Sequence, residues 1–403
     1  MSALALRDAS IVVVSSIDWD FVWQAHQEIA SRLAAGGNRV VFVENTGGVR
    51  SVRVSDTRRV LRRAGSAAAQ MLRGDRRPST NVTVVAPLIV PFQGSRIARY
   101  LNDRVFTPRL AAKIRRVAGG DPIVYTYLPT ENALRLLDLL GGRDTPVIYH
   151  AVADFQAIAP DVAAIARTEA ELVRRANVVL VQSAGLKRRF DPLNRNVHDV
   201  GIGVDLALFD PDRATVAPEI AGLPHPVIGY IGGVHHHLDF GLLRSLARSF
   251  RSGTLVVIGP LLVDDAELPR EPNIRYLGAR PHAELPELVA AFDVGLIPYR
   301  RTTYTATVNP TKLFEYLAMG VPVVSTDLPE VVALALPDSI ARVAGDPTEW
   351  ASAVAAAVSD GDPRHRTLRR TTALDHDWSR IVERIASLVA SNDRAARRDA
   401  ARR

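Results

Sequence analysis

The sequence contains no cysteine among its 403 residues. This absence excludes disulfide bonds, thiolate metal sites and cysteine nucleophiles. No stretch approaches the roughly 20 apolar residues of a membrane span, and the opening MSALALRDASIVVVSS lacks the long apolar segment of a secretory signal peptide. No repeat of fixed period is present. These absences predict a soluble cytoplasmic protein, with peripheral attachment to the inner face of the membrane left open.

Basic residues are concentrated in one stretch of the chain. Residues 49–116 contain sixteen Lys or Arg and three Asp, a net charge of +13, whereas the whole chain carries only +7. This stretch is either a solvated arginine-rich face or a surface for anionic lipid or an anionic lipid-linked acceptor, to which each basic residue adds about 1 kcal/mol. Aromatic residues are scarce between the arginines, so no nucleic-acid partner is expected. In a helix, one basic stripe would contain Arg58, Arg59, Arg62 and Arg63.

The length suggests two domains of about 150 to 200 residues each. Short β-branched runs alternate with amphipathic helical stretches, which is typical of parallel sheets covered by helices. The pattern restarts near residue 205, after VGIGVDLALFDPD, and the proline-rich DPDRATVAPEIAGLPHP fits a linker. The expected strands are IVVVSS, RVVFVEN, VTVVAP, PIVYTYLP, PVIYHAV and NVVLVQS, then PVIGYIGG, TLVVIGP, NIRYLG, DVGLIPY, VPVVSTD and SIARVAG. We therefore predict an α/β protein with two doubly wound, Rossmann-like parallel-sheet domains.

A glycine pair follows the first strand of the second predicted domain. Ligands in such sheets bind outside the carboxyl ends of the strands. Gly232 and Gly233 would let the backbone approach a ligand closely, and the stretch VHHHLDFGLLRSLARSF is expected to begin a helix whose free N–H groups favour an anion. The adjacent His235, His236 and His237 do not share a face and no carboxylate–histidine motif accompanies them, so no metal site is expected.

A second helix start lies in NPTKLFEYLAMGVPVVSTDLPEV, residues 309–331. Asn309 is expected to be the N-cap, with Pro310 in the first turn. Lys312 and Glu315 then share one face at i,i+3. The helix dipole and the lysine suit a phosphate, while the carboxylate can accept hydrogen bonds from vicinal ribose hydroxyls. A nucleotide diphosphate satisfies both demands, and an exposed i,i+3 salt bridge explains the same residues equally well.

The segment GLIPY…NPTKLFEYLAMGVPVVSTDLPEV resembles the donor-binding segment of GT-B glycosyltransferases. The resemblance is to the GT4-like group (glycosyl transferases group 1), which builds bacterial polysaccharides and glycoconjugates. SSIDWDFVWQAHQEIASRLAAGGNRVVFVEN is similar to that group's opening strand, acceptor-side loop and first helix. GIGVDLALF, GYIGG with LDFGLL, and WSRIVERIASLV are similar to its interdomain segment, the start of its C-terminal domain and its last helix. The resemblance covers most of the chain and implies the GT-B fold, two Rossmann-like domains facing across a cleft.

The resemblance also implies a division of labour between the domains. Residues 1–203 would form an acceptor-binding domain on which the C-terminal helix, 376–391, packs back. Residues 204–375 would bind the nucleotide-sugar donor, and 392–403 would form a basic tail. The implied reaction moves a hexose or deoxyhexose from a nucleotide-diphosphate sugar to a hydroxyl of a polysaccharide, a lipid-linked glycan or a natural product. It would proceed with retention, without a metal and without a cofactor other than the donor substrate.

Two other functions fit the same family resemblance. A GT-B sugar-nucleotide epimerase would need carboxylates and histidine in a closed cleft. A non-catalytic accessory subunit would need none of Asn309, Lys312 and Glu315, so their joint presence argues against it.

The resemblance assigns roles to individual residues. Lys312 would neutralise the diphosphate and Glu315 would hold the ribose. The remaining expected donor contacts are Gly232, Gly233, His235, Tyr299, Asn309, Thr311 and Leu313. The acceptor would enter near Asp18, Trp19, Trp23 and His26.

Two catalytic candidates lie in YHAVADF, at the end of a first-domain strand. His150 stands where relatives commonly have Asp, and it is expected to bind the donor sugar or assist proton transfer. A hydrogen-bonded cleft histidine is the alternative. Asp154 is expected to be its partner or to contact the acceptor. The chain departs from the family at Thr307, eight residues before Glu315, where retaining members often have Glu, and at His235–His237, where many members place Arg and Lys.

Overall fold

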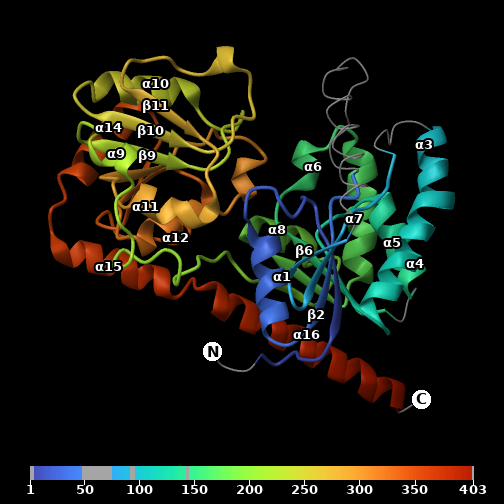
Figure 1. Ribbon diagram of the computed structural model, residues 1–403. Coiled ribbons are helices and arrows are strands. Elements are labelled where there is room, and N and C mark those ends of the chain that lie inside the picture. Colours follow the sequence, from blue (N-terminus) through green and yellow to red (C-terminus); the bar gives the residue numbers. More distant parts are fainter. Residues whose placement is uncertain (1–3, 48–74, 91–95, 142–144, 402–403) are drawn as a thin grey trace. The chain divides into compact units, whose positions relative to one another are not determined.

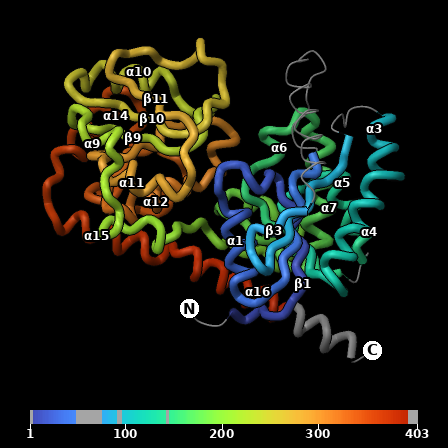
Figure 2. Tube along the Cα trace, viewed as in Figure 1, coloured from blue at the N-terminus to red at the C-terminus, as the bar shows by residue number. Residues whose placement is uncertain are grey.

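The structure is a computed structural model, which describes residues 4–47, 75–90, 96–141 and 145–401 (Figure 1). The chain divides into two compact units. Unit 1 comprises residues 1–200 and 382–403, and unit 2 comprises residues 201–381. Figure 2 follows the chain through unit 1 in blue to green, then through unit 2, to the red C-terminal segment.

Unit 1 contains an eight-stranded sheet with the strand order β3-β4-β2-β1-β5-β6-β7-β8. All neighbours are parallel except β3 and β4. The strands are β1 (Ser10–Val14), β2 (Arg39–Val43), β3 (Arg76–Ser79), β4 (Val82–Val85), β5 (Ile123–Thr126), β6 (Val147–Ala151), β7 (Val178–Val181) and β8 (Val197–Asp199). The helices are α1 (Ala25–Ala35), α3 (Arg96–Leu101), a π-helical stretch (Asn102–Phe106), α4 (Thr107–Ala118), α5 (Glu131–Leu140), α6 (Phe155–Ile158), α7 (Val162–Arg175) and α8 (Ala184–Phe190).

Unit 2 contains a fully parallel six-stranded sheet with the strand order β11-β10-β9-β12-β13-β14. Its strands are β9 (Val227–Ile231), β10 (Thr254–Ile258), β11 (Ile274–Gly278), β12 (Val294–Ile297), β13 (Val323–Thr326) and β14 (Ala341–Ala344). Its helices are α9 (Pro218–Ala221), α10 (Phe240–Ser249), α11 (Leu285–Val289), α12 (Thr311–Ala318), α13 (Pro329–Val332), α14 (Pro347–Val358) and α15 (Pro363–Leu374). The last helix, α16 (Trp378–Ala401), begins in unit 2 and continues in unit 1.

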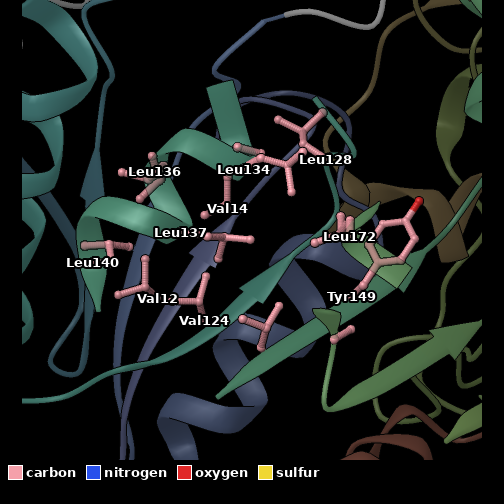
Figure 3. Packing of buried hydrophobic residues seen from close by; sticks show 14 of the residues in the cluster. Val12, Val14, Val124, Leu128, Leu134, Leu136, Leu137, Leu140, Tyr149 and Leu172 are labelled. Atoms are coloured by element: carbon pink, nitrogen blue, oxygen red, sulfur yellow. The ribbon is translucent and has the colours of Figure 1, made fainter. Parts of the chain in front are cut away.

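The core of unit 1 follows from the alternation of side chains along its strands. Val12, Val14 and Val124 point to one face of the sheet, where the leucines of α5 pack on them (Figure 3). The next residues in each strand face the other way, and there Ile29 and Leu33 of α1 are buried. Because both faces are covered, the strands are nearly continuous apolar runs, as the sequence predicts. The predicted fold class, two doubly wound parallel-sheet units, is confirmed.

Three local predictions are wrong. The stretch FVWQAHQEIASRLAAGG was expected to be helical from Phe21, but the first helix begins at Ala25, because the Gln24 N–H donates to Gln27 Oε1 and caps the helix there. The helix after the glycine pair begins only at Phe240, capped by the Asp239 side chain, so the histidine triplet lies in a loop. The N-cap of α12 is Pro310 in an extended conformation, and Asn309 precedes it.

Each sheet has one point at which the strand order reverses. In unit 1 this point lies between β1 and β5, and in unit 2 it lies between β9 and β12. Crevices at the carboxyl ends of the strands beside such a point are the usual ligand sites of open α/β sheets. Among the described residues, no helix is both long enough and apolar enough to cross a bilayer.

Candidate functional site

In unit 2, the polar residues predicted from the sequence meet beside the switch point of the sheet. Gly232 directly follows β9, Tyr299 follows β12, and Lys312 lies in the first turn of α12. The Lys312 Nζ donates a hydrogen bond to the Tyr299 hydroxyl at 2.8 Å. A Cβ at Gly232 would lie 2.5 Å from Lys312 Cε, so a larger residue would displace the lysine side chain, and the φ of +130° favours glycine.

The ammonium of Lys312 lies near two aromatic rings. Its distance to the ring centroid is 5.4 Å for both Tyr230 and Tyr299. Both distances are within the range of a cation–π contact. Within the part of the chain that the structure describes, the hydrogen bond of the ammonium goes to Tyr299 and not to Glu315. The exposed Lys312–Glu315 salt bridge considered as an alternative is therefore not formed.

Glu315 is half-buried rather than exposed, and it lies in the second turn of α12. Burial raises the pKa of the Glu315 carboxyl, while His282 and Lys312 act in the opposite direction. Burial of this carboxylate costs desolvation free energy. A buried carboxylate one turn from a lysine is typical of a ligand-binding group.

The loop after the glycine pair is fixed by aromatic contacts. A Cβ at Gly233 would lie 3.5 Å from His235 Cδ2, so the His235 ring lies beside this glycine. His235 and His237 form an edge-to-face pair, and His237 stacks on Tyr304 with centroids 4.3 Å apart. These contacts hold the loop after β9 against the loop after β12. His236 points to Glu267 and is 69% exposed. Asn309, Thr311 and the buried Leu313 lie at the start of α12.

An open cavity of about 480 Å³ lies elsewhere in unit 2, at the ends of β13 and β14. It is lined by Arg301, Asp327, Asp346 and Glu349 among others. Arg301 is already paired with Asp327 at 2.5 Å, so the free charges of this cavity are mainly acidic. A phosphate would be repelled there, and the anion-binding candidate remains the Lys312 side of the sheet.

In unit 1, two of the predicted residues meet in one buried cluster. His26 is the second residue of α1 and His150 lies in β6. The Tyr127 ring lies between them, 3.8 Å from the His26 ring and 5.3 Å from the His150 ring, on which it stacks. His26 Nε2 pairs with Ser16 Oγ at 2.9 Å, and His150 Nδ1 with the Tyr125 hydroxyl at 2.7 Å. The second ring nitrogen of each histidine has no hydrogen-bond partner among the described residues.

Both imidazoles are neutral at physiological pH. Burial lowers the pKa of His150 to about 3. Burial also lowers the pKa of His26 to about 3, with a smaller contribution from His150. A charged imidazole in this cluster would lose its hydration without gaining an anionic partner.

Asp154 is not the partner of His150. Its carboxylate caps α6 by accepting hydrogen bonds from the Gln156 and Ala157 N–H groups, and it pairs with Arg189 at 2.9 Å. The tyrosine that does bind His150 was not predicted, because Tyr125 lies on the neighbouring strand, 25 residues earlier in the sequence.

The predicted acceptor-side residues Asp18, Trp19 and Trp23 lie in the loop between β1 and α1. Trp19 packs edge-on against Trp23 and Phe42. Asp18 is exposed. This aromatic loop directly precedes α1, in which the His26 ring points into the buried cluster with Tyr127.

Known proteins with similar sequences and folds include glycosyltransferases. The family model described as glycosyl transferases group 1 matches residues 225–360, within unit 2. The chain is 31% identical over 236 residues to TuaH of Bacillus subtilis (strain 168), which is assigned to teichuronic acid biosynthesis as a glycosyltransferase. That match spans 55% of this chain and 58% of the relative.

Solved structures with the same fold extend over nearly the whole chain. Sucrose-phosphate synthase from Thermosynechococcus elongatus is 14% identical with a TM-score of 0.69, covering 96% of this chain and 100% of that one. The Anabaena protein HepE in complex with UDP-glucose is 15% identical with a TM-score of 0.66, covering 94% and 99%. The predicted resemblance to GT-B glycosyltransferases is thereby confirmed: residues 225–360 match the model of the glycosyl transferases group 1 family, and the chain has the GT-B fold.

Proposed function

We propose that this protein is a glycosyltransferase that moves a sugar from a nucleotide-diphosphate sugar to a hydroxyl acceptor. The observation that carries this proposal is the position of the Lys312 ammonium. Lys312 lies at the start of α12 beside Gly232, and its ammonium is held by two uncharged groups, the Tyr299 hydroxyl and the Tyr230 ring. A positive charge that is fixed but not neutralised is suited to a diphosphate. The helix N-terminus adds to the same field.

Each donor-site residue has a role in this proposal. Lys312 offsets the charge that develops on the departing diphosphate. Glu315 accepts hydrogen bonds from the ribose hydroxyls. The Gly232–Gly233 turn, His235, Tyr299 and the Asn309–Leu313 segment surround the phosphates and the sugar. HepE, whose structure contains UDP-glucose, supports a uridine nucleotide as the first donor to try.

In the reaction, the bond between the anomeric carbon and the diphosphate oxygen breaks, and the electron pair leaves with the diphosphate. The acceptor oxygen forms the new bond to the anomeric carbon, and its proton passes to the departing phosphate. His150 is a poor general base, because burial lowers its pKa to about 3. We therefore propose that His150 binds a sugar hydroxyl as a neutral group, with His26 and the Trp19–Trp23 loop on the acceptor side. The proposal includes retention of configuration and no metal.

A screen of donors tests the activity. We expect hydrolysis of at least one among UDP-, dTDP- and GDP-sugars, together with a rise in the thermal unfolding midpoint. Lys312→Ala should lower turnover more than Lys312→Arg, because the arginine keeps a positive charge near the diphosphate. Equal turnover in the two variants would contradict the role of Lys312. Binding without any turnover would favour an accessory subunit.

Replacing Glu315 by glutamine should weaken binding of the nucleoside diphosphate by about tenfold or more, because hydrogen bonds to a charged group contribute about 1.5–3 kcal/mol. The variant should be no less stable at pH 7.5. Burial raises the folded-state pKa of Glu315, so the ionised carboxyl opposes folding at neutral pH and its removal relieves that cost.

Calorimetric titration with UDP, dTDP and GDP, together with thermal unfolding, measures both effects. Glu287→Gln, at an exposed position of α11, is the matched control. Unchanged affinity in Glu315→Gln would rule out the ribose contact.

The proposal extends to an anionic membrane or a lipid-linked acceptor as a partner of residues 49–116. The four arginines at 58, 59, 62 and 63 lie outside the described residues. In the described part, Ile97 and Tyr100 of α3 are 72% and 64% exposed beside the exposed Arg96 and Arg99. Exposed apolar side chains flanked by arginines suit the interface of an anionic bilayer.

Sedimentation with vesicles tests this partner. We expect binding to vesicles of phosphatidylcholine and phosphatidylglycerol but not to phosphatidylcholine alone. The bound fraction should fall steeply from 20 mM to 150 mM salt, since exposed charges are screened beyond about 8 Å at the higher salt. Arg96→Glu with Arg99→Glu should lower binding while donor hydrolysis persists. Binding that ignores both salt and charge reversal would leave the arginines as a solvated face.

A further inference from the structure

Tyr230 contacts both sides of the candidate phosphate site, although the sequence analysis assigned it no role. It is the fourth residue of β9 and only 1% exposed. Its ring faces the Lys312 ammonium at 5.4 Å, and its hydroxyl donates a hydrogen bond to the Gly233 carbonyl oxygen at 3.0 Å. One side chain thus connects the lysine of α12 with the glycine turn after β9.

The chemistry of this contact matters for an anion site. Burial raises the pKa of Tyr230 well above its ordinary value, and Tyr299 and Tyr316 act in the same direction. The phenol therefore stays neutral. A carboxylate in its place would hold Lys312 equally firmly but would cancel its charge, whereas an aromatic face orients the ammonium and leaves the charge available. Preorganised charge of this kind is what stabilises a developing anion.

Contacts of the neighbouring residues also hold Tyr230 in place. The hydroxyl of Tyr316 accepts a hydrogen bond from the Ile231 N–H at 2.9 Å, next to Tyr230 in the strand. The Gly232 N–H donates to the Ile258 carbonyl at 2.8 Å. The end of β9 is thus held on both sides of the tyrosine.

We infer that Tyr230 is a positioning residue, which orders Lys312 through its ring and the Gly232–Gly233 turn through its hydroxyl before the donor diphosphate binds. This inference rests on the proposed function of the same site. Tyr230 itself does not touch the ligand and acts through Lys312. The competing explanation is that Tyr230 only fills the core of unit 2.

A double-mutant cycle separates these explanations. The probe is whichever of UDP, dTDP and GDP the wild type binds, titrated into wild type, Tyr230→Leu, Lys312→Ala and the double variant. We expect Tyr230→Leu to weaken binding about tenfold, in line with a desolvated cation–π contact. In the Lys312→Ala background the same change should have little further effect, because the cation is gone. Tyr230→Phe, which keeps the ring, should stay within about threefold of the wild type.

Each outcome decides the inference. Additive effects of Tyr230→Leu and Lys312→Ala, or wild-type affinity in Tyr230→Leu, would overturn it and leave a core residue. If Tyr230→Leu does not fold, Tyr230→Met removes the ring while filling the same space. Tyr276→Leu, at a tyrosine of β11 whose hydroxyl donates a hydrogen bond to the Pro269 carbonyl, controls for the loss of a tyrosine elsewhere in unit 2.

A wild type that binds none of the three nucleotides would overturn the proposed function itself. Binding that depends on Lys312 but not on Tyr230 would overturn only the role of Tyr230.

Discussion

Replacing Gly259 by alanine should greatly weaken nucleotide binding, although Gly259 is not one of the residues assigned to the donor site. Gly259 follows β10, has a φ of +146°, and an added Cβ would lie 1.9 Å from the Gly232 carbonyl oxygen. The turn that carries Gly232 must then move away, and with it the backbone that lies against Lys312. We expect a loss of roughly 2–5 kcal/mol in the free energy of unfolding, from backbone strain and overpacking. Affinity for the nucleoside diphosphate should fall about a hundredfold, as displacements of about 1 Å do in active sites.

Gly222→Ala is the matched control for this variant. Gly222 is also in unit 2, its φ is −101°, and no atom lies within 4 Å of a Cβ built on it. We expect stability within about 0.5 kcal/mol of the wild type and unchanged affinity. Titration calorimetry and denaturant unfolding measure both quantities. A Gly259→Ala protein that binds nucleotide like the wild type would show that the position of Gly232 is not critical to the site.

The strands could be predicted from the sequence because their signal is local. Each of the twelve β-branched runs overlaps one strand of the structure. The two strands that were not predicted are β3, with the sequence RRPS, and β8, with only three residues, VHD. Both lie at the edges of the unit 1 sheet. Three of the four residues of β3 are exposed, and only one of the three residues of β8 is buried, so neither strand has an apolar run to detect.

Helix starts were harder to predict, because side chains that cap or pack decide them. The stretch FVWQAHQEIASRLAAGG has apolar residues at helical spacing, but Trp19 and Trp23 pack against each other in a loop and the helix begins only after Gln24. At α12 the sequence pair Asn309-Pro310 suggested an asparagine cap. The structure begins the helix one residue later, with Pro310 extended and its carbonyl accepting from the Leu313 N–H at 3.1 Å.

The pairwise contacts within the candidate site were predictable only where the residues are neighbours in sequence. Lys312 and Glu315 share one helix face, and their spacing is visible in the chain. Other contacts come from other elements: Tyr230 from β9, and His282 from the 3-10 helix (His282–Glu284) before α11. Only the strand order brings these segments together. The sequence therefore predicted Lys312, Glu315 and Tyr299, but it did not predict the contacts that Tyr230 and His282 make with them.

The same limit applies to unit 1, where the His26–Tyr127–His150 cluster joins residues more than 100 positions apart. From the sequence, His26 and His150 had separate roles on the acceptor and catalytic sides. The structure shows them on either side of one tyrosine ring, with both pKa values lowered by burial. A histidine pair of this kind affects stability whatever its part in the reaction, and this effect can be measured without knowing the substrate.

Acidification should destabilise the protein through this pair. The pKa of each histidine falls from 6.5 to about 3 on folding, so between these values the unfolded chain binds protons that the folded chain does not. Stability is therefore complete above pH 6.5 and is lost as the pH falls toward 3. At pH 5 each histidine should have removed about 2 kcal/mol from the free energy of unfolding, or about 4 kcal/mol for the pair.

The slope of the free energy of unfolding against pH measures the contribution of the two histidines, whereas stability at a single pH does not. Denaturant unfolding at pH 7.5, 6.5, 5.75 and 5 gives the slope for wild type, His150→Gln and His26→Gln. We expect each variant to lose about half of the slope that the pair contributes, even if it is less stable at pH 7.5, because it has one buried imidazole fewer to protonate. His236→Gln, at a histidine 69% exposed, should keep the wild-type slope. A slope unchanged in both cluster variants would mean that the imidazoles are protonated in the folded protein, and His150 would then be available as a charged group near neutral pH.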